Sequence, residues 1–143
     1  MKKYITLFLF TVLTFAVAHT AKSQSKFDNW PELKTFHKVM SGTFHPMEDG
    51  NLAPIRERSG EMVEKATALA ASKIPDEYNN KEVQQAVKDL ESGSKKLDAM
   101  IKDKAGDDDI KKSLTALHDT FHVIVEKCVK GDEDHHQHEH GKE

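Results

Sequence analysis

Residues 80–106 read NKEVQQAVKDLESGSKKLDAMIKDKAG, and this stretch decides the fold class. Its apolar side chains recur at alternating spacings of three and four residues, the period of one face of an α-helix. The stripe consists of Val83, Val87, Leu90, Ser94, Leu97 and Ile101. Asn79 or Asn80 can cap the start of the helix, and Gly106 is expected to stop it. The segment is therefore predicted to be one amphipathic helix that packs against others.

A helix of the same kind is predicted near the beginning of the chain. Asp28 or Asn29 can cap it, and Pro31 suits its first turn. The helix is expected to run to about Phe44 and to be ended by Pro46. Its stripe consists of Trp30, Leu33, His37, Met40 and Phe44.

Two more helices complete the pattern. Pro54 lies in the first turn of one of them, and Pro75 closes it. The acidic residues 107–109 favour the positive end of the last helix. Short connections make neighbouring helices antiparallel, so residues 28–130 are predicted to form an all-α, up-down-up-down antiparallel four-helix bundle.

The two ends of the chain differ from this domain. Residues 1–18 combine Lys2 and Lys3, a short apolar run and an Ala-Val-Ala site, which is the pattern of a secretory signal peptide. Residues 19–27 form a polar leader, and residues 131–143 form an acidic, histidine-rich tail that is expected to be disordered. The chain is therefore predicted to be periplasmic or secreted, without insertion into a membrane.

Overall composition limits the function classes. The 143 residues are 37% hydrophobic and 31% charged, with a net charge of −3, so nucleic acid is not an expected partner. Cys128 is the single cysteine, which excludes an intramolecular disulfide and leaves open whether it is buried or a ligand. No sequence motif pairs a nucleophile with its base, so the protein is not expected to be an enzyme.

Nine histidines are the most informative feature of the composition. His37 lies in the apolar stripe of the first helix, and His118 and His122 lie one turn apart on the last helix. If the helix ends are aligned, these three imidazoles meet at one level of the bundle interior. Neutral imidazole is a common ligand of Zn, Cu and Ni, so the three histidines are predicted to bind a divalent transition metal.

Other side chains are expected to surround these ligands. Ser59 and Ser94 replace apolar residues in their stripes at the same level, and Met40 is close to His37. His45, two turns from His37, either shapes the loop or adds a fourth metal ligand. A purely structural role remains an alternative, in which the polar layer is hydrogen-bonded and sets the helix register.

Further histidines lie outside the bundle. The tail is predicted to provide weak metal sites, because a flexible chelator must be ordered before it binds. These residues are His135, His136, His138 and His140. His19 would be the first residue after cleavage at Ala18, where it could bind copper.

Residues 62–75 (MVEKATALAASKIP) and 120–122 (TFH) resemble the cytochrome c-prime and soluble b-type cytochrome superfamily of periplasmic four-helix bundles. The resemblance implies an electron-transfer protein with non-covalent haem, whose axial ligands would be His37 and His122. The chain has no C-x-x-C-H motif, so covalent attachment of haem is excluded.

Three functions therefore compete: a non-enzymatic metal-binding bundle that sequesters, delivers or senses the ion, a haem protein, and a structural or interaction bundle with a hydrogen-bonded polar layer. An envelope metal-handling or redox partner, or a second copy of this chain, remains open as a protein partner.

Overall fold

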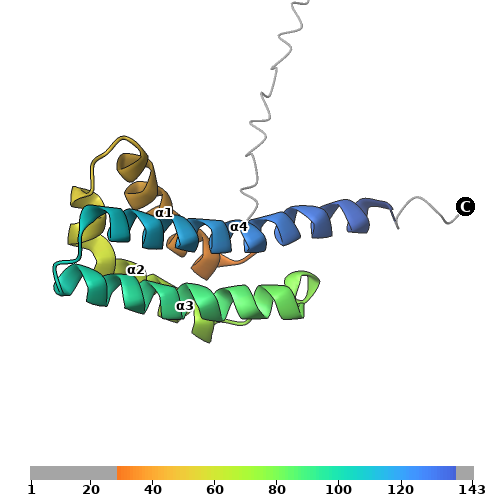
Figure 1. Cartoon of the computed structure of the whole chain (residues 1–143). Helices are drawn as coiled ribbons and strands as arrows, with labels where there is room; N and C mark the ends of the chain where they lie inside the picture. Colours follow the sequence, from red (N-terminus) through yellow and green to blue (C-terminus); the bar gives the residue numbers. More distant parts are fainter. Residues whose placement is uncertain (1–28, 138–143) are drawn as a thin grey trace, which may run out of the picture.

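The structure is a computed structural model that describes residues 29–137, and within this range it is all-helical. Four α-helices form a four-helix bundle, as predicted (Figure 1). They are α1 (Pro31–Glu48), α2 (Ala53–Ala71), α3 (Lys81–Lys102) and α4 (Asp107–Gln137). A short 3-10 helix, η1 (Asp76–Tyr78), lies between α2 and α3.

The core is formed by the apolar stripes of all four helices. Its fully buried members include Leu33, Met62, Leu90 and Leu114, one from each helix. Burial of such side chains contributes about 1.5–3 kcal/mol each, which makes the stripes the main source of stability. The predicted helical stripes thus supply most of the buried core, whereas His37 of α1 is only half-buried.

The beginning of α1 is fixed by a buried aromatic side chain. Trp30 occupies the N-cap position without a side-chain capping bond, and it is only 1% exposed. Its Nε1 donates a hydrogen bond to Ser72 Oγ at 3.0 Å, which joins the start of α1 to the end of α2. The predicted cap at Asn29 is wrong: its side-chain amide donates to Glu77 instead.

The end of α1 also differs from the prediction. Pro46 lies inside the helix, which continues to Glu48. A proline this close to the end removes only one helical hydrogen bond, and continuation buries Met47 in the core. The backbone nitrogen of Asn51 then donates to the Pro46 carbonyl at 2.8 Å and closes the turn.

The boundaries of α2 and α3 follow local rules more closely. Asn80 caps α3 as predicted, because its side chain accepts from the backbone nitrogens of Glu82 and Val83. The helix ends at Lys102, before the predicted stop at Gly106, because Lys104 turns the chain with φ at 58°. Pro75 does not close α2, which ends four residues earlier at Ala71.

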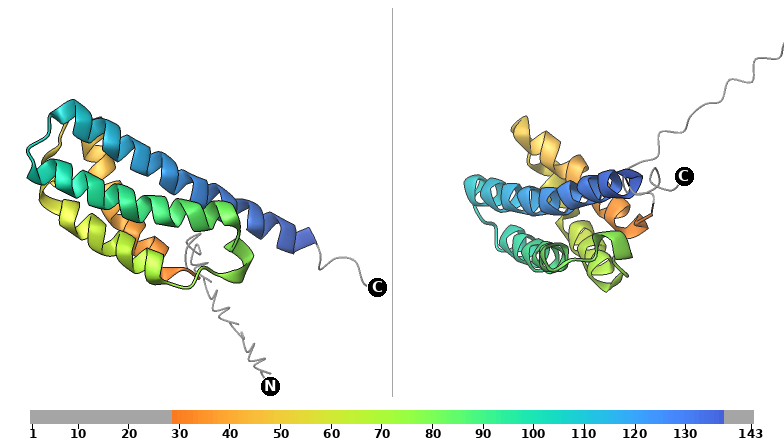
Figure 2. Two further views of the ribbon diagram at one scale, coloured as in Figure 1. Left: turned by 60° about the horizontal axis from the view of Figure 1, so that its bottom comes forward. Right: turned by 90° about the vertical axis from the view of Figure 1, so that its right-hand side faces the viewer.

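The last helix is longer than predicted. α4 begins at Asp107, as the acidic run indicates, but it continues to Gln137 instead of ending near residue 130. Gly131 costs a helix only about 1 kcal/mol relative to alanine, and no proline follows it. α4 therefore extends beyond the other three helices (Figure 2), and residues 131–137 of the predicted disordered tail are helical.

The four helices do not pack equally. α2 contacts α1 and α3, and α3 contacts α4, along much of their lengths, whereas α1 contacts α4 only over a short stretch. In Figure 1, α1 passes behind α4 at an angle. The α1–α4 junction is therefore the least closed side of the bundle, and it carries histidines on both helices.

Several predictions concern residues outside the described range. The signal peptide at 1–18, the leader at 19–27 with His19, and the tail residues His138 and His140 all lie there. Among the helices that are described, none combines the length and apolar character that a bilayer span requires.

Candidate metal centre

A pocket of about 170 Å³ lies at the junction of α1 and α4. Four imidazoles line it, two from each helix, together with a thioether, a hydroxyl and an aromatic ring. The lining residues are His37, Met40, Ser41, His45, His118, Phe121 and His122. The structure thus brings together all four histidines that the sequence proposed as bundle ligands.

His118 and His122 form the closest pair in this pocket. They are one turn apart on α4, and their Nε2 atoms are 3.2 Å apart. Without a metal, one nitrogen donates a hydrogen bond to the other. Two nitrogens bound to one tetrahedral ion, each at about 2.0–2.1 Å, are separated by about 3.3 Å. The pair therefore already has the spacing of two ligands on a single metal ion.

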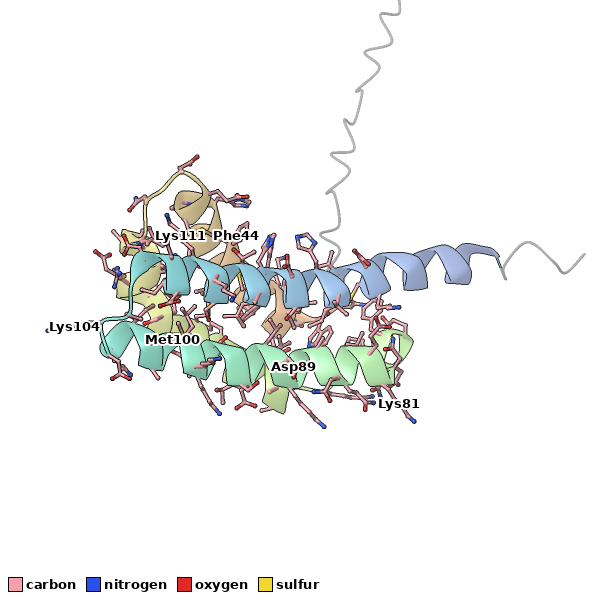
Figure 3. The ribbon with its side chains drawn as sticks, in the orientation of Figure 1. Phe44, Lys81, Asp89, Met100, Lys104 and Lys111 are labelled. Carbon is pink, nitrogen blue, oxygen red and sulfur yellow. The ribbon has the colours of Figure 1, made fainter. Side chains whose placement is uncertain are left out.

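Aromatic rings hold two of the imidazoles in place. His118 stacks on Phe44 of α1, with ring centroids 3.6 Å apart and planes 6° from parallel. His37 stacks on Phe121 of α4, with centroids 5.2 Å apart and an interplanar angle of 5°. Each contact crosses the junction (Phe44 is labelled in Figure 3), so the two helices orient each other's histidines.

The burial of the histidines corrects one sequence prediction. His37 is expected at the centre of the buried face of α1, but it is half-buried and does not belong to the apolar core. Phe36 and Val39 occupy that face, which turns His37 toward α4. His118 is also half-buried, and His122 is exposed. The site is therefore a pocket at the bundle surface, accessible to an ion from solvent.

His45 has a partner that the sequence analysis missed. Its Nδ1 lies 2.9 Å from Glu48 Oε2, three residues along α1. A carboxylate only accepts hydrogen bonds, so Nδ1 carries a proton, and Nε2 is the nitrogen of the neutral ring that has a lone pair. A carboxylate behind an imidazole is a common arrangement around metal ligands. The His-x-x-Glu spacing on one helix face was the signal that could have identified Glu48.

The surroundings keep two of the imidazoles neutral. Burial lowers the pKa of His37, and the nearby His45 and His122 lower it further. Burial and His122 also lower the pKa of His118, against smaller opposing effects of Asp119 and Glu48. Because both pKa values lie below their ordinary value of 6.5, both rings are mainly unprotonated at pH 7 and have a lone pair for a metal.

The pocket is not a closed coordination sphere. Within the described part of the chain, no three His, Cys, Asp or Glu side chains converge closely enough to hold a metal ion. His118 and His122 are within hydrogen-bond distance of each other, whereas His37 and His45 line the same pocket without completing a group of three.

The predicted supporting residues lie in different places. Met40 lines the pocket, whereas neither Ser59 nor Ser94 does. Ser59 donates to Asp98 Oδ1 of α3 at 2.8 Å, and the buried Ser94 Oγ makes no hydrogen bond in the described structure. Ser59 of α2 and Ser94 of α3 are thus both buried. The hydroxyl group of Ser59 is satisfied by its hydrogen bond to Asp98.

The remaining candidates do not join the pocket. Cys128 is buried in the core and is not among the pocket residues. His135 and His136 lie on the last turns of α4, where only the backbone is described.

A larger pocket of about 440 Å³ lies between α3 and α4. Gly93 and Ala116 form part of its wall, and Asp89 and Met100, both labelled in Figure 3, lie along α3. It contains neither His37 nor His122, the two axial ligands that the cytochrome resemblance implies.

A scan against protein-family models finds no match, and searches of the curated proteins and of the solved structures find no significant match either. The resemblance to c-prime and b-type cytochromes therefore stays a prediction, and the function has to be argued from the pocket.

Proposed function

We propose that this chain is an exported, non-enzymatic four-helix bundle that binds a transition-metal ion in the α1–α4 pocket. His118 and His122 provide two nitrogen ligands, and His37 or His45 provides the third. The observation that carries the proposal is the 3.2 Å separation of two Nε2 atoms in a pocket lined by two further imidazoles. Export is supported by the signal-peptide pattern of residues 1–18.

The ligand set favours Zn, Cu or Ni over Ca or Mg. Ca and Mg prefer oxygen ligands, whereas the polar atoms of the four lining histidines are imidazole nitrogens. Three protein ligands and an open position would allow the ion to be passed on, which suits sequestration, delivery or sensing. The tail histidines would add weak sites that collect the ion.

Haem has less support. The pocket beside His37 and His122 has a volume of about 170 Å³. Pockets that hold organic ligands usually measure about 300–1,000 Å³. A haem with these two axial ligands would have to separate α1 from α4 and break the ring stacking between them.

Elemental analysis and an absorption spectrum test the proposal. Protein purified without an affinity tag and dialysed should be free of a Soret band and should retain a single transition-metal ion per chain. His118→Ala should abolish retention, and Thr115→Ala, an exposed change on the same helix, should not. A Soret band would support haem. Metal-free protein whose thermal midpoint does not respond to added Zn, Cu or Ni would leave only a structural role.

A further inference from the structure

The lining of the pocket contains one feature that a generic metal site does not need. Beside the imidazoles lies the side chain of Met40, whose thioether is a soft ligand. Neither a carboxylate nor a thiolate is among the residues that line this pocket. A donor set of imidazole nitrogens and thioether sulfur suits copper better than zinc or nickel, and the thioether favours Cu(I).

The charge of the lining residues is also compatible with Cu(I). Every ligand in the lining is neutral when its imidazoles are unprotonated, and the carboxylate of Glu48 contacts His45 from outside the lining. Phe44 and Phe121 stack on two of the imidazoles and keep water away from one side of each ring. A neutral ligand set of this kind is compatible with a monovalent ion, which brings less charge to the half-buried rings than a divalent ion does.

Two lining residues of α1, Met40 and His45, carry a sulfur and a nitrogen ligand atom. His45 Nδ1–H donates a hydrogen bond to Glu48 Oε2, so Nε2 is the nitrogen left for a metal ion when the ring is neutral. Met40 lies on the same helix, where it is buried in the core and lines the pocket, and a rotamer change of its unbranched side chain is needed to aim the sulfur at the imidazoles. His118 and His122 complete the set from α4.

From these contacts we infer that the pocket selects copper, and Cu(I) in particular, with the Met40 thioether as a ligand beside the imidazoles of His118 and His122. This inference rests on the proposed metal-binding function and names its ion. It requires no redox step, because the ion binds and leaves as Cu(I).

The test compares Cu(I) with Zn(II) in the full chain. Cu(I) affinity is measured anaerobically by competition with bicinchoninate, and Zn(II) affinity by competition with a chromophoric chelator. Met40→Leu preserves the side-chain volume and should weaken Cu(I) binding at least about tenfold while leaving Zn(II) binding unchanged. Met47→Leu is the matched control, because Met47 is buried on the same helix but is not among the pocket residues.

The outcomes separate the inference from the proposed function. Equal affinity of the wild type and Met40→Leu for Cu(I) would overturn the inference, as would equal losses for both ions, which would indicate a packing role for Met40. In either case, Zn(II) binding that depends on His118 would leave the proposed function intact. Absence of binding of any metal by the wild type would overturn both.

Discussion

Phe44 and His118 stack face to face across the junction of α1 and α4, with ring centroids 3.6 Å apart. The contact belongs to the core on one side, since Phe44 is only 7% exposed, and to the histidine pocket on the other. It therefore couples the packing of the bundle to the orientation of a proposed metal ligand.

Phe44→Leu should loosen this coupling. We expect a loss of about 1 kcal/mol in the free energy of unfolding, together with weaker metal binding, because the His118 ring loses the surface that orients it. Phe36→Leu is the matched control, because Phe36 is fully buried on the same helix but packs against Phe121 instead of His118. The ring centroids of Phe36 and Phe121 are 5.9 Å apart. Urea unfolding and metal titration of both variants check the prediction. Equal effects of the two changes on metal affinity would show that Phe44 does not position His118.

The two histidines with lowered pKa values predict how stability depends on pH. Below about pH 6.5 the unfolded chain binds protons at His37 and His118 that the folded chain resists. The free energy of unfolding of the metal-free protein should therefore decrease as the pH falls through 6.5. Above about pH 7.5 these two histidines should no longer make the free energy of unfolding depend on pH.

Replacing both residues by glutamine should flatten the profile between about pH 7.5 and 5.5. The measurement is denaturant unfolding at several pH values in the presence of a chelator. A double variant with the same slope as the wild type would contradict the prediction.

Ser59 and Ser94 should respond differently to the loss of their hydroxyl groups. Ser59 donates to Asp98, so Ser59→Ala should cost about 1 kcal/mol. Ser94 Oγ is buried without a hydrogen-bond partner in the described structure, so Ser94→Ala should be neutral or stabilising by up to about 1 kcal/mol. Thermal unfolding of the two variants measures the difference. A larger loss for Ser94→Ala would show that its hydroxyl group has a partner.

Gly93 permits the close approach of α3 and α4. A Cβ atom added there would lie 2.7 Å from Leu117 Cδ2, so the end of the Leu117 side chain has to shift and Gly93→Ala should destabilise the protein by about 1 kcal/mol. The same change at Gly60, which lies inside α2 with no heavy atom within 4 Å of an added Cβ, should stabilise by about 0.5–1 kcal/mol. The two variants should shift the unfolding midpoint in opposite directions. Stabilisation by Gly93→Ala would contradict the packing of α3 against α4.

The fold could be predicted because helical stripes are strong, local signals. Asn80 and Asp107 begin their helices as local rules indicate, since a cap or an acidic first turn acts within one turn of the chain. The two ends of α1, at Trp30 and after Pro46, depart from these local rules. Burial of Trp30 and Met47 in the core outweighs the local preference there. The length of α4 was missed because polar composition alone does not end a helix.

The site could be predicted only in part. The i, i+4 spacing places His118 beside His122 whatever the tertiary structure is. Their meeting with His37 depends on how α1 crosses α4, and a helical wheel does not fix that angle. The partnership of Ser59 with Asp98 was missed because Asp98 lies next to Leu97 on the edge of its stripe, and packing alone decides its direction.

The metal content of two full-length variants tests the central claim most directly. One variant replaces His118 and His122 by alanine, and the other replaces His135, His136, His138 and His140. After dialysis, the tail variant should retain one tightly bound ion per chain and the pocket variant should retain none. The reverse result, with the ion lost from the tail variant and kept by the pocket variant, would contradict the assignment of the site to α1 and α4.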